Sequence, residues 1–363
     1  MDPKARLVGL DALRGLAALA VVFHHFTGRY GDVARCEFPV SFTFIYGNFG
    51  VQLFFIISGF VISLTLERTR GGVDFFASRF SRLWPAFVAC MAVTLGVLAW
   101  DRPPWQSVPG IGTVLKNLTM APEYFHGECV DGSYWSLAYE VLFYALAGAC
   151  YYGLRARRTE VLGLFWMALA ATLDRLSVVP IPLQIRMAFS VQYVPLFVIG
   201  VILYRLRQGD RSRLSFVVLI LAVLLCSARE PWAIKPIGRI PYVAMVVGFA
   251  AIVWFATRER TPMAVVAPLV FLGDISYSVY LVHQQVGYVL IRRLTLLGLS
   301  PNQCLWIAVL SVILLGFAIS KLVEKPGQRA LRALFARFRS LPASGPPAEA
   351  FLAPPADPGA RTD

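Results

Sequence analysis

Charge is scarce in this chain. Asp, Glu, Lys and Arg make up 15% of its 363 residues, whereas hydrophobic residues make up 57%. The mean hydropathy of +0.63 lies outside the range of soluble globular proteins. The composition therefore excludes a soluble enzyme or soluble binding domain and predicts a polytopic membrane protein.

Several motifs of common enzyme and metal sites are also missing. The six cysteines form no CxxC pair and no Cys/His spacing typical of zinc, so we expect no metal site. No GxSxG motif surrounds Ser58 or Ser63, which disfavours a hydrolase-type nucleophile. The first apolar run lacks a small-residue cleavage site, so we expect no cleaved signal peptide.

The charges that are present are mostly basic. There are 34 Lys and Arg against 21 Asp and Glu, which gives a net charge of +13. Apolar runs of suitable length predict an all-α protein with about ten transmembrane helices. The predicted ranges are 8–28, 44–66, 84–100, 134–153, 159–173, 189–205, 213–228, 240–257, 268–291 and 303–323.

The positions of the basic residues predict the orientation. With the N-terminus in the cytoplasm, most Lys and Arg clusters fall in cytoplasmic loops, as the positive-inside rule requires, and Arg292 and Arg293 are the main exception. This rule explains the net charge better than nucleic-acid binding, so we expect a lipid bilayer and no nucleic acid as partner. The predicted location is the bacterial cytoplasmic membrane, with both termini cytoplasmic.

The domain organisation is simple. One transmembrane domain is predicted over residues 1–340, and the Pro/Ala-rich tail 341–363 is predicted to be disordered and cytoplasmic. The long loop 101–133 is predicted to be external and is a candidate lid or acceptor platform. Cys36 and Cys129 fall in predicted external loops, where a disulfide can persist. A bridge and two free thiols both remain open.

Two ionisable residues share the first apolar run. Arg14 and His25 are eleven residues apart, which is three helical turns plus about 20°, so both lie on one face, about 16 Å apart along the axis. His24 lies about 80° from that face. Because buried ionisable groups are costly in a membrane, this pair predicts a functional site. An alternative is that Arg14 pairs structurally with Asp11, three residues earlier.

Glu140 is a candidate partner for His25. It lies about 9 Å below the outer end of the fourth predicted span, in the same leaflet as His25. A carboxylate beside an imidazole fixes the tautomer and stabilises the imidazolium. We therefore expect His25 to act as general base, with Glu140 orienting its ring. His283, in the ninth span, is a candidate for the same cavity, although a buried histidine is often only a hydrogen-bonded packing residue.

Arg79 and Arg82 lie three residues apart, on one side of a helical turn at the predicted cytoplasmic surface. Paired guanidiniums suit phosphate groups, which predicts donor binding. The alternative is a topology anchor or a site for anionic lipid.

Six motifs occur in the same order as in one known family. They are LDALRGLAALAVVFHHF with Arg14 and His25, FFIISGFVIS at 54–63, the RxxR of Arg79 and Arg82, YWSLAYEVLFY with Trp135, Glu140 and Tyr144, GDISYSVYLVH ending at His283, and EKPGQR at 324–329. Over roughly residues 7–335 the chain resembles the acyltransferase-3 family of bacterial membrane O-acyltransferases. It resembles the stand-alone members, which lack an SGNH hydrolase-like domain.

The resemblance implies transfer of an acyl group, commonly acetyl, from cytoplasmic acyl-CoA to a hydroxyl of a glycan, a lipid-linked sugar or a small molecule. It implies that His25 is the essential histidine and that Arg14, Arg79 and Arg82 serve the donor. Further candidate pocket residues are Asp11, Ser58, Trp135, Tyr144 and His283. We expect acyl-CoA as co-substrate and no bound cofactor.

The expected function is therefore O-acetylation of an exported or lipid-linked polysaccharide. One alternative is acylation of a small molecule such as a macrolide. Another, of a different class, is a proton-coupled transporter or flippase, because such carriers also bury His, Glu and Arg in a bundle of many spans.

Overall fold

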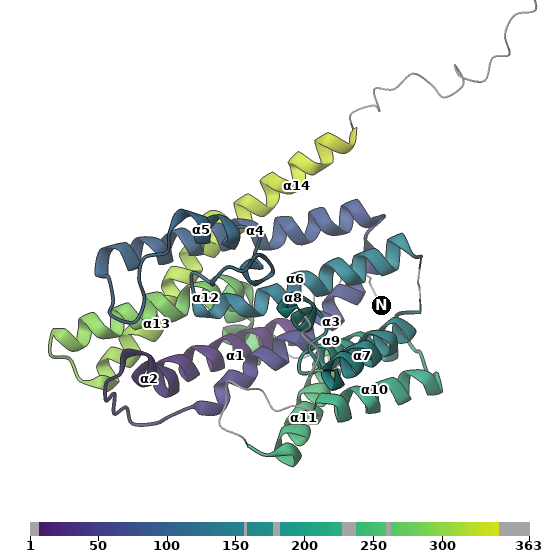
Figure 1. Ribbon diagram of the computed structural model, residues 1–363, viewed down its shortest axis with the longest axis horizontal. Helices are drawn as coiled ribbons and strands as arrows, with labels where there is room; N and C mark the ends of the chain where they lie inside the picture. The colour runs from purple at the N-terminus through teal and green to yellow at the C-terminus, as the bar shows by residue number, and fades with distance from the viewer. Residues whose placement is uncertain (1–6, 156–157, 177–181, 227–236, 259–262, 341–363) are drawn as a thin grey trace, which may run out of the picture.

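The computed structural model describes residues 7–155, 158–176, 182–226, 237–258 and 263–340 (Figure 1). Within these ranges the chain is helical and contains no β-strand, which confirms the all-α prediction. The α-helices are α1 Val8–Phe23, α2 Tyr30–Ala34, α3 Gly50–Arg68, α4 Gly72–Asp101, α5 Ile111–Asn117, α6 Trp135–Gly148, α7 Thr159–Arg175, α8 Leu183–Ala188, α9 Val194–Arg207, α10 Arg213–Cys226, α11 Arg239–Arg258, α12 Met263–Leu296, α13 Pro301–Ile319 and α14 Lys325–Ser340.

Six helices in the described ranges are long and apolar enough to cross a membrane. They are Val8–Ala34, Ile45–Arg68, Gly72–Asp101, Arg239–Arg258, Val266–Leu296 and Pro301–Arg337. The other predicted spans also coincide with helices, but these are short. At 14 residues, α9 extends only about 21 Å, less than the roughly 30 Å of a bilayer core. A multi-pass membrane protein is thus supported, whereas the predicted count of about ten is not confirmed.

The long helices run roughly along one direction and give the bundle two ends (Figure 1). We call the end where α3 finishes and α4 begins, near Arg79 and Arg82, the basic end. The opposite end, which carries the segment Arg102–Asp131 with α5, is the loop end. From the basic end, α14 continues the line of α13 and projects away from the bundle. The predicted tail 341–363 lies outside the described residues.

Glycines allow the central helices to approach closely. A Cβ on Gly15 of α1 would overlap the Leu269 carbonyl oxygen of α12, and one on Gly273 of α12 would overlap the Asp11 carbonyl oxygen of α1. The pair Gly59 and Gly200 brings α3 and α9 together in the same way. Small residues at helix contacts are how membrane helices gain van der Waals packing, since burial from lipid provides no hydrophobic driving force.

The exception to the charge rule has a structural explanation. At the loop end, Asp101 is fully buried and binds both Arg292 and Arg293, with 2.9 Å between its Oδ1 and Arg292 Nη1. The Arg293 guanidinium also lies over the Trp100 ring, 4.6 Å from its centroid. These two arginines are therefore held by a local partner.

Both loop cysteines are free thiols in the structure, so the second alternative left open by the sequence holds. Cys36 is exposed, whereas the Cys129 thiol donates to Glu123 Oε1 at 2.9 Å. Burial, with the adjacent Glu123 carboxylate, raises the pKa of Cys129, because both disfavour the thiolate.

We predict that Gly59→Ala lowers the free energy of unfolding by about 1–3 kcal/mol, the usual cost of overpacking. The new methyl group would meet the backbone of Phe197, which cannot move aside cheaply. Gly96→Ala, in α4 with open space around the position, is the matched control and gains up to about 1 kcal/mol of helix propensity. Thermal unfolding in detergent measures both. Equal melting temperatures for the two variants would contradict the proposed α3–α9 contact.

Candidate active site

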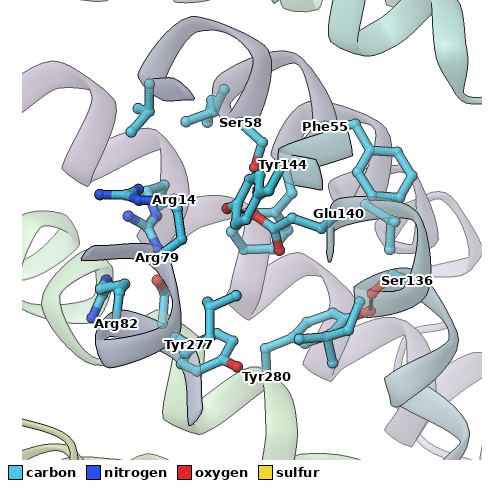
Figure 2. A pocket seen from close by; sticks show the side chains of 17 residues that line it. Arg14, Phe55, Ser58, Arg79, Arg82, Ser136, Glu140, Tyr144, Tyr277 and Tyr280 are labelled. Atoms are coloured by element: carbon cyan, nitrogen blue, oxygen red, sulfur yellow. Dashed lines mark hydrogen bonds between the residues drawn. The ribbon is translucent and has the colours of Figure 1, made fainter. Parts of the chain in front are cut away.

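A pocket of about 80 Å³ lies between α1, α3, α4, α6 and α12 (Figure 2). It contains residues from five separate sequence motifs. Its polar lining consists of Arg14 from α1, Ser58 from α3, Arg79 and Arg82 from α4, Ser136, Glu140 and Tyr144 from α6, and Ser276, Tyr277 and Tyr280 from α12.

Glu140 is held firmly within this pocket. Its Oε1 accepts a hydrogen bond of 2.8 Å from the Ser58 hydroxyl, and Tyr144, one turn further along α6, donates to the same oxygen. Both donors, which the sequence indicated only as possible pocket residues, therefore fix this carboxylate. The three arginines occupy the wall across from Glu140 and Tyr144 (Figure 2).

The structure corrects the predicted contact between Glu140 and His25. Val130, Asp131 and Tyr134, which lead into α6, are themselves fully buried, so α6 begins well inside the bundle. Glu140 consequently lies deeper than its position in the predicted span suggests, at the level of Arg14. Its partners are Ser58 and Tyr144, and His25 has a different partner.

Arg82 is already engaged by a carboxylate. It pairs with Glu324, whose side chain is fully buried, and the Ser278 hydroxyl donates to the other Glu324 oxygen at 2.7 Å. Arg79 differs, because its Nη2 donates only to Ser78 Oγ at 3.2 Å and its buried Nε has no hydrogen-bond partner among the described residues. The RxxR motif thus supplies one neutralised arginine and one that can bind a ligand.

The lining of the pocket holds more cations than carboxylates. With Arg82 paired to Glu324, the guanidiniums of Arg14 and Arg79 share the lining with the carboxylate of Glu140, and Asp11, outside the lining, also lies within electrostatic range of Arg14. An anionic group would restore the balance, and guanidiniums bind phosphate oxygens well. The pocket is suited to an anionic ligand.

His25 forms a hydrogen-bonded pair with His283 of α12. His283 Nε2 lies 3.0 Å from His25 Nδ1, and His283 Nδ1 lies 2.7 Å from the Tyr280 carbonyl oxygen. His25 Nδ1 is also 3.0 Å from the Val21 carbonyl oxygen.

These contacts fix the tautomers of two neutral rings. A carbonyl oxygen only accepts, so His283 carries its proton on Nδ1 and accepts at Nε2. His25 then carries its proton on Nδ1, which donates to His283 and Val21. The lone pair of His25 Nε2 is left for chemistry. This assignment follows from the hydrogen-bond network.

The histidine pair lies next to the pocket, outside its lining. Tyr280 lines the pocket, and its ring centroid is 5.7 Å from that of His283. Its hydroxyl is 2.8 Å from Ser136 Oγ. His283 follows Tyr280 by three residues on α12, about 4.5 Å further toward the loop end. Tyr280 thus marks the boundary between the cationic pocket and the histidines.

The remaining candidates lie outside the pocket. Trp135 packs against Tyr193, with 5.3 Å between ring centroids, because the α6 face that it shares with Tyr139 points toward α9. Asp11 lies within electrostatic range of Arg14, and its backbone contacts Gly273. His24 is buried beside His25, and its Nδ1 has no partner in the described part of the chain.

Two functional features were missed by sequence reasoning. One is Glu324, whose signal was an acidic residue directly after an apolar run, in the EKPGQR motif. The other is the polar stripe Ser276, Tyr277 and Tyr280, whose helical spacing places it on one face with the predicted His283. Both His25 and Glu324 lie in π-helical segments, η1 His24–Arg29 and η6 Ser320–Glu324, and such segments are frequent at functional sites.

The comparisons with known proteins identify the family of the chain. The family model described as an acyltransferase domain, that of the acyltransferase-3 family, matches residues 7–323. The chain therefore belongs to this family of membrane acyltransferases, and the resemblance noted from its motifs is confirmed.

Individual relatives include a protein named for exopolysaccharide production and two named as acyl-group transferases. The exopolysaccharide production protein ExoZ of Rhizobium meliloti (strain 1021) is 29% identical over 306 residues, 80% of this chain and 92% of that protein. An O-acetyl transferase of Shigella phage Sf6 is 26% identical over 38% of this chain and 44% of its own length. The membrane-bound transacylase BcsY of Komagataeibacter xylinus is 31% identical over 40% and 37%, respectively. No solved structure matches the chain.

We predict that replacing only one residue of the Arg82–Glu324 pair destabilises the protein more than replacing both. Glu324→Met leaves the partly buried Arg82 guanidinium uncompensated and costs up to about 3–5 kcal/mol, whereas the double variant Arg82→Met plus Glu324→Met recovers much of this loss. Thermal unfolding of the wild type, both single variants and the double variant forms the complete cycle. Strictly additive losses would show that the two side chains do not interact.

Proposed function

We propose that this protein is an O-acetyltransferase of the bacterial cytoplasmic membrane, which moves an acetyl group from acyl-CoA to a hydroxyl of an exported or lipid-linked polysaccharide. One observation carries the proposal. A pocket with excess positive charge lies one helical turn from a neutral histidine pair whose free nitrogen is suited to take a proton. The names of the ExoZ and phage relatives support the polysaccharide acceptor and the acetyl group.

The proposed orientation places the basic end in the cytoplasm. Arg68, Arg79 and the arginines of α14 gather there, and the positive-inside rule assigns such clusters to the cytoplasmic side. Both termini would then be cytoplasmic, and the Arg102–Asp131 segment would lie outside. The donor would approach the basic end, and the acceptor would approach the loop end.

The donor would enter along α1 and α12. A phosphate of acyl-CoA would bind at Arg79 and Arg14, and the thioester arm would extend past Tyr280 to His25. Along α1, Arg14 and His25 are separated by eleven residues, or about 16 Å. The nucleotide would therefore remain at the basic end while the thioester carbonyl reached the acceptor.

In the transfer step, His25 Nε2 would remove the proton from the acceptor hydroxyl as its oxygen attacks the thioester carbonyl carbon. The carbon–oxygen bond forms and the carbon–sulfur bond breaks. The departing thiolate takes the proton back from His25, which restores the neutral ring. A positioned general base of this kind contributes about 10² to 10⁴ in rate.

His283 would take the positioning role that the sequence suggested for Glu140. Its Nε2 accepts the His25 Nδ1 proton and so keeps the reactive lone pair on Nε2. When His25 becomes an imidazolium, the same hydrogen bond becomes charge-assisted and stronger. Glu140, held by Ser58 and Tyr144, would hold the donor-side arginines in place.

We predict that His25→Ala lowers acetyl transfer by at least about 10²-fold, because the base is lost. His283→Leu should also reduce the rate, and His283→Gln should restore part of it, since a Gln carbonyl can accept the His25 proton. The readout is acetylation of surface polysaccharide, by mass spectrometry, in a deletion strain complemented with each variant.

The control for this test is Gly96→Ala in α4, where a Cβ would meet open space, and it should behave like the wild type. Wild-type acetylation by His25→Ala protein would refute the proposed base. Unchanged polysaccharide in the deletion strain would refute the proposed acceptor and favour a small molecule. Substrate counterflow without acyl-CoA turnover would favour the transporter alternative.

A further inference from the structure

A second cavity lies outside the site described above. A groove of about 390 Å³ runs between the first turns of α4 and helix α14, and it is several times larger than the pocket. Its lining consists of Val73, Asp74, Ala77, Ser78, Arg332, Phe335 and Ala336.

The groove adjoins the pocket at one pair of residues. Ser78 lines the groove, and its hydroxyl accepts a hydrogen bond from Arg79, which lines the pocket. Arg332, on the α14 side, lies within electrostatic range of Arg79. A ligand that extends from the groove into the pocket would therefore pass between two guanidiniums.

The groove has a mixed chemical character. Arg332 supplies a cation for a phosphate, and Phe335 supplies an aromatic side that also contacts Phe80, with 6.3 Å between ring centroids. Asp74 and Ser78 supply oxygens that accept hydrogen bonds from amino or hydroxyl groups. A cation, an aromatic ring and polar acceptors together match a nucleotide better than inorganic phosphate or a bare anionic surface.

The α14 side of the groove is fixed to the bundle. Glu324, one residue before α14, is the buried partner of Arg82 in α4. A Cβ on Gly327 would lie 2.7 Å from Pro85 Cβ, so the first turn of α14 packs directly on α4. The EKPGQR motif thus holds Arg332 at a defined place beside Arg79.

We propose that this groove binds the nucleotide portion of the acyl-CoA donor, with Arg332 on a phosphate, while the thioester arm enters the pocket at Arg79. The inference rests on the proposed function and adds a site for the half of the donor that the 80 Å³ pocket cannot hold. It also gives α14 a specific function.

The test compares two donors that share the same thioester arm. Acetyl-CoA carries the nucleotide, and S-acetylpantetheine lacks it. Release of free thiol is measured with purified protein and polysaccharide extracted from the deletion strain. We expect Arg332→Gln to raise the KM for acetyl-CoA at least about tenfold, since it removes a hydrogen bond to a charged group, and to leave the kinetics with S-acetylpantetheine unchanged.

Two further measurements make the result specific. Arg329→Gln is the matched control on α14, because Arg329 is exposed, donates to the Lys325 carbonyl oxygen and is absent from the groove lining. Adenosine 3′,5′-bisphosphate should inhibit the wild type in competition with acetyl-CoA. It should no longer inhibit the Arg332→Gln variant, whereas the Arg332→Lys variant should be inhibited in part.

Different outcomes would overturn different claims. If Arg332→Gln left the KM for both donors unchanged, or raised the KM for both equally, the groove would not hold the nucleotide. The assay is repeated with the protein in lipid vesicles with and without anionic lipid. If Arg332→Gln lowered activity with both donors equally, and only when anionic lipid was present, Arg332 would be assigned to a phospholipid headgroup and the proposal would also be overturned. If the wild type used neither donor, the acyl-CoA dependence in the proposed function would itself fail.

Discussion

The close packing of α1 against α12 is the constraint on which the rest of the site depends. Gly15 and Gly273 bring the two backbones into contact, because neither position leaves room for a side chain. At this separation, Arg14 and Tyr277 line one cavity, and His25 reaches His283 further along the same two helices. A larger residue at either glycine would separate both pairs at once. The geometry of the pocket and of the histidine pair is therefore set by a contact between two glycines and the backbone.

Charge is distributed unequally along this pair of helices. Toward the basic end, the linings of the two cavities hold Arg14, Arg79 and Arg332 against the carboxylates of Glu140 and Asp74, since Arg82 is paired with Glu324. Toward the loop end, the two histidines bind each other as neutral rings. Binding an anion and accepting a proton are conflicting demands, because a cation beside an imidazole disfavours its protonation. Placing these functions about 16 Å apart on one helix removes that conflict.

Much of this arrangement could be predicted from the sequence. Arg14 and His25 are conspicuous because ionisable residues are rare in apolar runs, and the all-α fold follows from the lengths of those runs. Ser58 and Tyr144 were indicated as pocket residues from their motifs, and both line the cavity with Glu140.

The rest depends on depth and on long-range contacts, which spacing along one helix does not report. The partner of His25 was assigned to Glu140 because both were placed in the same leaflet, yet the buried approach to α6 moves Glu140 down to Arg14. The pairing of Arg82 with Glu324 joins residues 242 positions apart. A helix as short as α9 also resembles a span in hydropathy, although its 14 residues extend less than the thickness of a bilayer core.

The central claim is that the acetyl group crosses from a donor at the basic end to an acceptor at the loop end. It is tested most directly by supplying acetyl-CoA to one side of sealed membrane vesicles and following acetylation of polysaccharide on the other. In inside-out vesicles, which expose the cytoplasmic face, external acetyl-CoA should acetylate polysaccharide sealed in the lumen, and right-side-out vesicles should show no transfer from external acetyl-CoA. Transfer that occurred only when donor and acceptor shared one compartment would contradict the account.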